Sequence, residues 1–102
     1  MAEQTALLNI TIHGELTIST AAGARSDLLN ALDTADEIEV DLAQVTEIDS
    51  AGVQIMVAAK REAVARSKTL RFIGHSLAVL DTLDLTDLAA YLGDPVLIQS
   101  RN

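Results

Sequence analysis

The feature that most constrains the fold is a regular change in the spacing of apolar residues along the chain. Leu8, Ile10 and Ile12 alternate with polar residues, which is typical of a strand with one buried face. Farther on, the apolar residues take a helical spacing: Ala21, Ala24, Leu28, Ala31 and Leu32. Two more strand-like segments follow, each succeeded by a helical one. This order predicts an α/β fold, with right-handed crossovers and helices packed against a mixed, mostly parallel sheet.

Flanking residues place the elements in the first half of the chain. Gly14-Glu15 predicts a tight turn into a second strand around Leu16 and Ile18, so that an antiparallel hairpin begins the sheet. A helix is expected from a cap at Ser19 or Thr20 to just before Asp36. The run 37–42 predicts a central strand, and Val45 and Ile48 extend its apolar character. A sheet of four to five strands is therefore expected.

The second half continues the alternation. Helix-favouring residues without proline predict a helix from Ser50 to about Arg66, and 69–73 predicts a short strand closed by Gly74. Ser76 can cap a third helix, for which a break is expected near Asp84, and these residues can continue it after the break: Leu85, Leu88 and Leu92. Asp94-Pro95 predicts a turn before 96–98, either an edge strand or a packed tail. One domain over 1–102 is expected, with its core at about 7–92 and a tail at 93–102.

Composition restricts the functions that such a domain can have. The 102 residues include no cysteine, which excludes thiol catalysis, disulfides and cysteine metal sites. The net charge of −8 disfavours nucleic acid and anionic lipid surfaces, and only Phe72 and Tyr91 could stack on bases. No apolar run approaches the roughly 20 residues of a membrane span, and the first residues lack a basic signal-peptide start. We expect a cytoplasmic protein with no cofactor.

Chemistry concentrates at Asp49-Ser50-Ala51-Gly52, between a predicted strand and a predicted helix. A helix N-terminus presents unpaired backbone N–H groups and partial positive charge. Ser50 there can be a helix cap, a nucleophile or a phosphate acceptor. A nucleophile elbow requires glycine two residues before the serine, and this chain has Ile48. Hydrolase chemistry is therefore disfavoured, while capping by Ser50 or Asp49 is compatible with phosphorylation.

These residues carry a resemblance to a known family. The run from Val40 to Val53, VDLAQVTEIDSAGV, resembles the signature of the STAS domain of sulfate transporters and anti-sigma factor antagonists. Gly14-Glu15-Leu16-Thr17 is similar to that family's early glycine-acidic-leucine turn, and the order of elements agrees from about Leu7 to Leu92. The resemblance thus covers nearly the whole chain and implies a non-enzymatic regulatory domain.

The resemblance implies a role for Ser50. In the antagonist branch, the matching serine is phosphorylated by a kinase-like anti-sigma factor and dephosphorylated by a phosphatase, and the unmodified form binds its partner. Transcription regulation in a bacterium by partner switching is the expected role. Members often carry a second hydroxyl where this chain has Ala51, and glycine where it has Gln54. Ser50 is therefore the only acceptor in the motif.

A surface for the partner is expected on the second helix. Val53, Met56, Val57 and Val64 should pack on the sheet, with the Lys60 ammonium reaching solvent. The opposite side carries small residues around one aliphatic group. We define the partner face as these residues: Asp49, Ser50, Ala51, Gln54, Ile55 and Ala58.

Other readings of the chain remain open. The same fold could serve as a STAS regulator in a chemotaxis or two-component pathway, or as a constitutive STAS subunit of a lipid-transport ATPase complex. A small enzyme is the least favoured alternative. Asp41, Glu47 and Asp49 are expected to be solvated or capping carboxylates rather than a metal site. His13 and His75 flank glycines in turns, and Arg61 and Arg66 are expected to form a solvated helix face.

Overall fold

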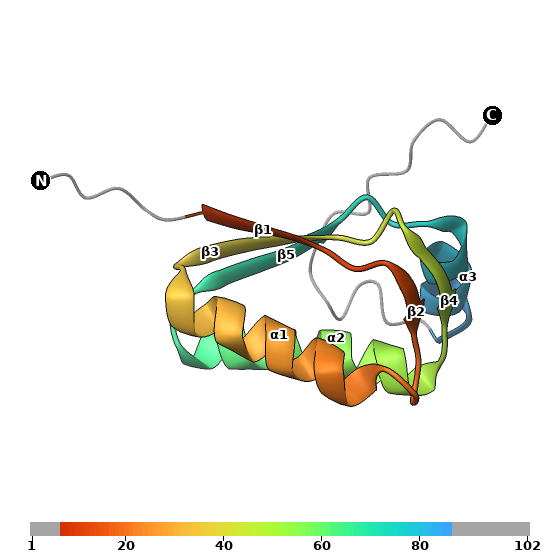
Figure 1. Ribbon diagram of the computed structural model, residues 1–102, viewed down its shortest axis with the longest axis horizontal. Coiled ribbons are helices and arrows are strands. Elements are labelled where there is room, and N and C mark those ends of the chain that lie inside the picture. The colour runs from red at the N-terminus through yellow and green to blue at the C-terminus, as the bar shows by residue number, and fades with distance from the viewer. Residues whose placement is uncertain (1–6, 87–102) are drawn as a thin grey trace, which may run out of the picture.

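The computed structural model describes residues 7–86, which form five strands and three helices (Figure 1). The strands are β1 (Leu7–Thr11), β2 (Gly14–Leu16), β3 (Glu37–Asp41), β4 (Val45–Ile48) and β5 (Thr69–Ile73). The helices are α1 (Ala21–Thr34), α2 (Ser50–Ala65) and α3 (Leu77–Thr86). The expected α/β class and strand number are confirmed.

Within the described residues the strands form a three-stranded sheet, ordered β1-β3-β5, and a two-stranded sheet, β2-β4. All neighbouring strands within these two sheets are parallel. β1 continues in direction into β2, and β3 into β4 (Figure 1). The antiparallel hairpin predicted at Gly14-Glu15 is therefore wrong. Gly14 has a φ of 75° and its N–H donates to the carbonyl of Gln44, so the chain bends there without reversing.

Two helices cover one face of the three-stranded sheet, and α3 contacts β4 (Figure 1). The alternating residues of β3 and β5 that face α1 and α2 are fully buried: Ile38, Val40, Leu70 and Phe72. The other face of this sheet carries an ion pair between Arg71 and Glu39, with 2.9 Å between nitrogen and oxygen. At the far ends of α1 and α2, Arg66 bonds both Asp33 and Glu62. The core thus lies between one sheet face and two helices.

The predicted bounds of α1, α2 and β5 are confirmed to within a residue. Helix α3 runs through Asp84 without a break, and Ser76 caps it by accepting a hydrogen bond from the N–H of Val79. Two details of α2 are wrong: Val64 is exposed, and the Lys60 amine donates to the carbonyl of Leu70. The buried stripe of α2 turns instead through Ala59 and Ala63 toward α1. The predicted continuation through Leu92 and the segment 96–98 lie outside the described residues.

Candidate functional site

Asp49 connects the start of α2 to the loop between β2 and α1. Its backbone is extended, and its Oδ1 accepts a hydrogen bond of 3.0 Å from the N–H of Gly52. Its Oδ2 accepts a second bond of 3.0 Å from the N–H of Ile18, which lies 31 residues earlier. The N-cap of α2 is therefore Asp49 and not Ser50. One carboxylate fixes both the helix start and the neighbouring loop.

These bonds also determine the charge of the site. The N–H of Ile18, and after it that of Gly52, hold the pKa of Asp49 below its usual range, because both bonds favour the ionised carboxylate. Asp49 therefore carries a full negative charge near neutral pH. Its charge is favourable at the N-terminus of α2, where the helix dipole is positive.

Gly52 explains why α2 can begin so close to β2. A Cβ atom on this residue would lie 2.0 Å from the carbonyl oxygen of Leu16 and 2.9 Å from Cγ1 of Ile48. Real atoms do not approach that closely, so only glycine fits between the helix and the strand. In the Asp-Ser-x-Gly motif, Asp49 and Gly52 are thus structural residues.

Ser50, unlike Asp49 and Gly52, has no structural role in the start of α2. It is the first residue of α2, its side chain is exposed, and its hydroxyl makes no hydrogen bond within residues 7–86. A group attached to its oxygen would project into solvent beside the Asp49 carboxylate and the first turn of α2. The hydroxyl can therefore be modified without breaking a contact described in the fold.

The predicted partner face occupies one side of α2, but its members differ in exposure. Ser50, Gln54 and Ala58 are exposed, whereas Asp49 and Ala51 are only partly exposed. Ile55 is not the isolated aliphatic group that the sequence suggested, because it packs partly against the core. The face therefore combines exposed polar and small side chains with one half-buried anchor.

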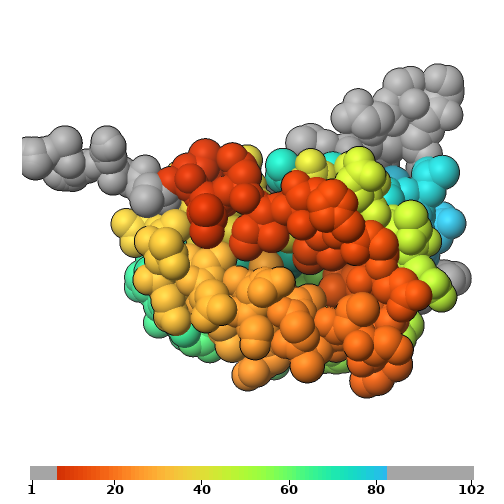
Figure 2. Space-filling view, in the orientation of Figure 1, coloured from red at the N-terminus to blue at the C-terminus, as the bar shows by residue number. Residues whose placement is uncertain are grey.

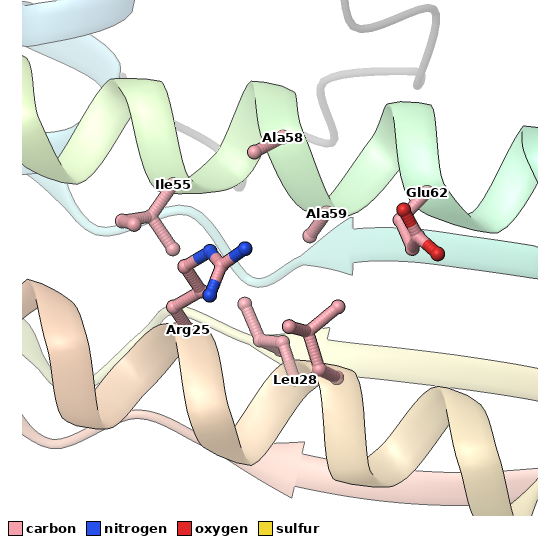
Figure 3. Close-up of a pocket in the computed structure, with 7 residues that line it drawn as sticks. Arg25, Leu28, Ile55, Ala58, Ala59 and Glu62 are labelled. Atoms are coloured by element: carbon pink, nitrogen blue, oxygen red, sulfur yellow. The ribbon is translucent and has the colours of Figure 1, made fainter.

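Ile55 lies in a shallow groove between α1 and α2 (Figure 3). Arg25 and Leu28 of α1 face Ile55, Ala59 and Glu62 of α2 across a volume of about 80 Å³. This volume is too small for a typical ligand, for which pockets of about 300–1,000 Å³ are usual. The groove can instead receive a single side chain from a docked protein.

Ile18 is a surface residue that the sequence did not reveal. It was predicted to share a strand with Leu16, but the strand ends at Leu16, which is 1% exposed, while Ile18 is 74% exposed. Its backbone is held next to Ser50 by the bond to Asp49. An exposed isoleucine therefore lies in a fixed loop beside the exposed Ser50.

The other candidate residues lie apart from Ser50 or have structural roles. Asp41 ends β3 and accepts a hydrogen bond from the N–H of Ala43, and Glu47 is exposed on β4. No group of histidine and acidic residues suited to a metal ion is found within residues 7–86. His13 lies between β1 and β2, and His75 between β5 and α3. Arg61 is exposed, whereas Arg66 is partly buried and connects α1 to α2.

Comparison with known proteins confirms the fold and the family that the sequence motif indicated. The fold matches the solved structure of the anti-sigma factor antagonist SpoIIAA in its unphosphorylated form, with a TM-score of 0.71 at 17% identity. The match covers 97% of this chain and 86% of that one. The family model described as "Mlab, STAS domain" matches residues 2–98, and the chain therefore belongs to the STAS domain family.

Among curated proteins, none matches the chain at a significant level. Within residues 7–86, no helix has both the length and the apolar character needed to cross a membrane.

Proposed function

We propose that this chain is a phospho-switchable signalling module, similar to an anti-sigma factor antagonist, which binds a regulatory protein when Ser50 is unmodified. The observation that carries the proposal is the division of roles within the motif. Asp49 caps α2 and Gly52 permits its close approach to β2, while the hydroxyl of Ser50 is exposed and unused. A serine free of structural duty at a helix N-terminus suits a reversible modification.

Electrostatics explains why phosphorylation would change binding and not folding. A phosphate adds about −1.5 to −2 charges, which the N-terminus of α2 tolerates within its own chain. The ionised Asp49 next to it already carries one negative charge, and a docked protein would have to desolvate both groups. A loss of about 1.4 kcal/mol weakens binding tenfold, and desolvation of an unpaired charge readily exceeds that amount.

The partner surface that we infer is the partner face together with Ile18. Apolar side chains accompany Ser50 on this surface: the exposed Ile18 lies in the loop bonded to Asp49, and the half-buried Ile55 and the exposed Ala58 follow Ser50 along α2. Such apolar contacts form the desolvated centre of an interface, where a new charge is most costly. The regulatory partner is therefore expected to present an apolar surface to this region, and an anti-sigma factor or kinase is the expected class.

The experiment is affinity purification of the tagged protein from its native cells, with mass spectrometry of Ser50 and of the retained proteins. Wild type and Ser50→Ala should retain the same partner, and Ser50→Asp should lose it. Ser26→Asp is the matched control, because Ser26 is also exposed but lies on α1 outside the partner face. Retention of the partner by Ser50→Asp, with no phosphate on Ser50 in any growth condition, would refute the switch.

One finding favours a second candidate. The matching family model is described as Mlab and not as an antagonist. The chain could accordingly be a constitutive STAS subunit of a larger assembly, such as a lipid-transport ATPase complex. The same purification separates the two functions: a constitutive subunit would recover ATPase subunits with wild type, Ser50→Ala and Ser50→Asp alike.

A further inference from the structure

The outer edge of β1 is open within the described residues. β1 is the first strand in the order β1-β3-β5 and pairs with β3 alone. The N–H of Ile12 donates to the carbonyl of Asp41, so the backbone groups of Ile12 face the sheet. Because these groups alternate in direction along a strand, those of Asn9 and Thr11 point outward. No strand of residues 7–86 pairs with these groups, so they form a template for another strand.

A cleft of about 300 Å³ runs beneath this edge, between β1 and α1 (Figure 2). Ile10 of β1 and Ile12 just after it contribute apolar side chains, as do Ala24 and Leu28 of α1. A strand added to β1 would direct alternate side chains to the same side as Ile10 and Ile12, and so into this cleft. Backbone pairing and side-chain pockets are the two elements of strand-addition recognition.

The cleft ends at the start of β2. There the hydroxyl of Thr20 donates a 3.0 Å hydrogen bond to the carbonyl oxygen of Glu15, which occupies the outward group of that strand. The open edge is therefore confined to β1 and is one short strand long. It is also separate from the Ser50 hydroxyl, because no residue of the partner face lines the cleft.

Gly23 supplies an independent indication that the cleft is kept open. This residue lies within α1, where glycine is a poor helix former, and a Cβ atom there would meet nothing within 4 Å. Folding alone would thus favour alanine at this position. Gly23 lines the cleft, so its missing side chain widens the space available to an incoming residue.

The charges at the rim identify the kind of occupant. Glu15, Asp27 and His13 line the cleft, within a chain whose net charge is −8. A second copy of this acidic chain would be repelled, whereas basic side chains would be attracted. The geometry points to a second binding site, at the β1 edge and the cleft beneath it, for an extended peptide segment of another protein in which apolar residues alternate with lysine or arginine.

Selection from a displayed library of random octapeptides tests this site without knowledge of the partner. The enriched peptides should alternate apolar and basic residues, and their binding should weaken as salt is raised. In amide hydrogen exchange of the full chain, the Asn9 and Thr11 amides should be unprotected alone and become protected when the best peptide is added. Absence of enrichment would overturn the proposal, as would protection of both amides without peptide, which would show that this chain already covers its own edge.

Two variants with matched controls locate the binding. Thr11→Pro removes an outward N–H and leaves the bond from Ile12 to Asp41, while Thr11→Val keeps that N–H. Gly23→Leu fills the cleft and serves if the proline variant does not fold. Both should weaken peptide binding by about tenfold or more, and Thr11→Val by less than about twofold. Unchanged binding to folded Gly23→Leu would overturn the site, whereas Ser50→Asp should bind the peptide like wild type.

Discussion

Replacement of glycine by alanine should have opposite effects at two matched positions in this protein. Gly23 and Gly52 are each the third residue of a helix, α1 and α2 respectively. In both, alanine gains about 0.5–1 kcal/mol from its better helix propensity. At Gly23 nothing opposes this gain, because the new Cβ would lie in open space. Gly23→Ala should therefore stabilise the fold by about 0.5–1 kcal/mol.

At Gly52 the same methyl group would lie 2.0 Å from the carbonyl oxygen of Leu16, which is a backbone atom and cannot rotate away. Helix α2 must retreat from β2, which also strains the bond from Ile18 to Asp49. Overpacking costs about 1–3 kcal/mol or more, and a contact this short belongs at the upper end. After the propensity gain is subtracted, Gly52→Ala should destabilise the fold by about 2 kcal/mol.

Thermal unfolding followed by far-ultraviolet circular dichroism measures both variants. For a domain of this size, 1 kcal/mol shifts the midpoint by about 4–8 °C. Gly23→Ala should raise the midpoint by about 2–8 °C and Gly52→Ala should lower it by about 8–16 °C. Equal stabilisation by both substitutions would refute the close packing of α2 on β2, and with it the explanation of glycine in the motif.

Three further outcomes follow from the site. Because the folded pKa of Asp49 is depressed, its contribution to stability is complete above the unfolded pKa near 3.8 and is lost as pH falls through the folded pKa. The Asp49→Asn variant should therefore lose less stability than wild type when both are unfolded at decreasing pH. Ile18→Asp should abolish partner binding without loss of thermal stability. Val64→Asp is the control, because Val64 is equally exposed at 74% but lies about 20 Å farther along α2; it should leave both partner binding and thermal stability unchanged. Ala58→Arg should block partner binding while the protein stays folded. Ile55→Asp should block binding and also lower the melting midpoint, because Ile55 packs against the core. Binding assays and melting curves of each variant check these outcomes.

Much of the fold could be predicted because its signals are local. The helix from Ser50 and the strand Thr69–Ile73 follow from caps, propensity and alternation within each segment. The hairpin at Gly14 was wrong because a glycine with positive φ permits either a reversal or a bend. The bond from its N–H to Gln44, far along the chain, decides between them. The alternation of strands and helices predicted a mostly parallel sheet, but the partner of each strand depends on residues distant in the chain.

The candidate site likewise contains residues that the sequence could predict and residues that it could not. Asp49 and Ser50 could be selected from the motif, since a helix start concentrates capping groups and exposed hydroxyls. Ile18 could not, because its loop is brought to that helix by contacts between residues far apart in the chain, among them the bond from the Ile18 N–H to Asp49, 31 residues later. The burial of Ile55 likewise depends on how closely α1 lies against α2, which the spacing of residues within one helix does not determine.

The most direct test of the proposed switch is the affinity of the recovered partner for this protein with phosphoserine installed at position 50. Isothermal titration calorimetry on the phosphorylated and unmodified forms gives both affinities, and circular dichroism on the same samples compares their folds. The proposed switch requires phosphorylation to weaken binding by about tenfold or more, with the melting midpoint nearly unchanged. Equal affinity of the two forms, with the fold intact in both, would contradict it.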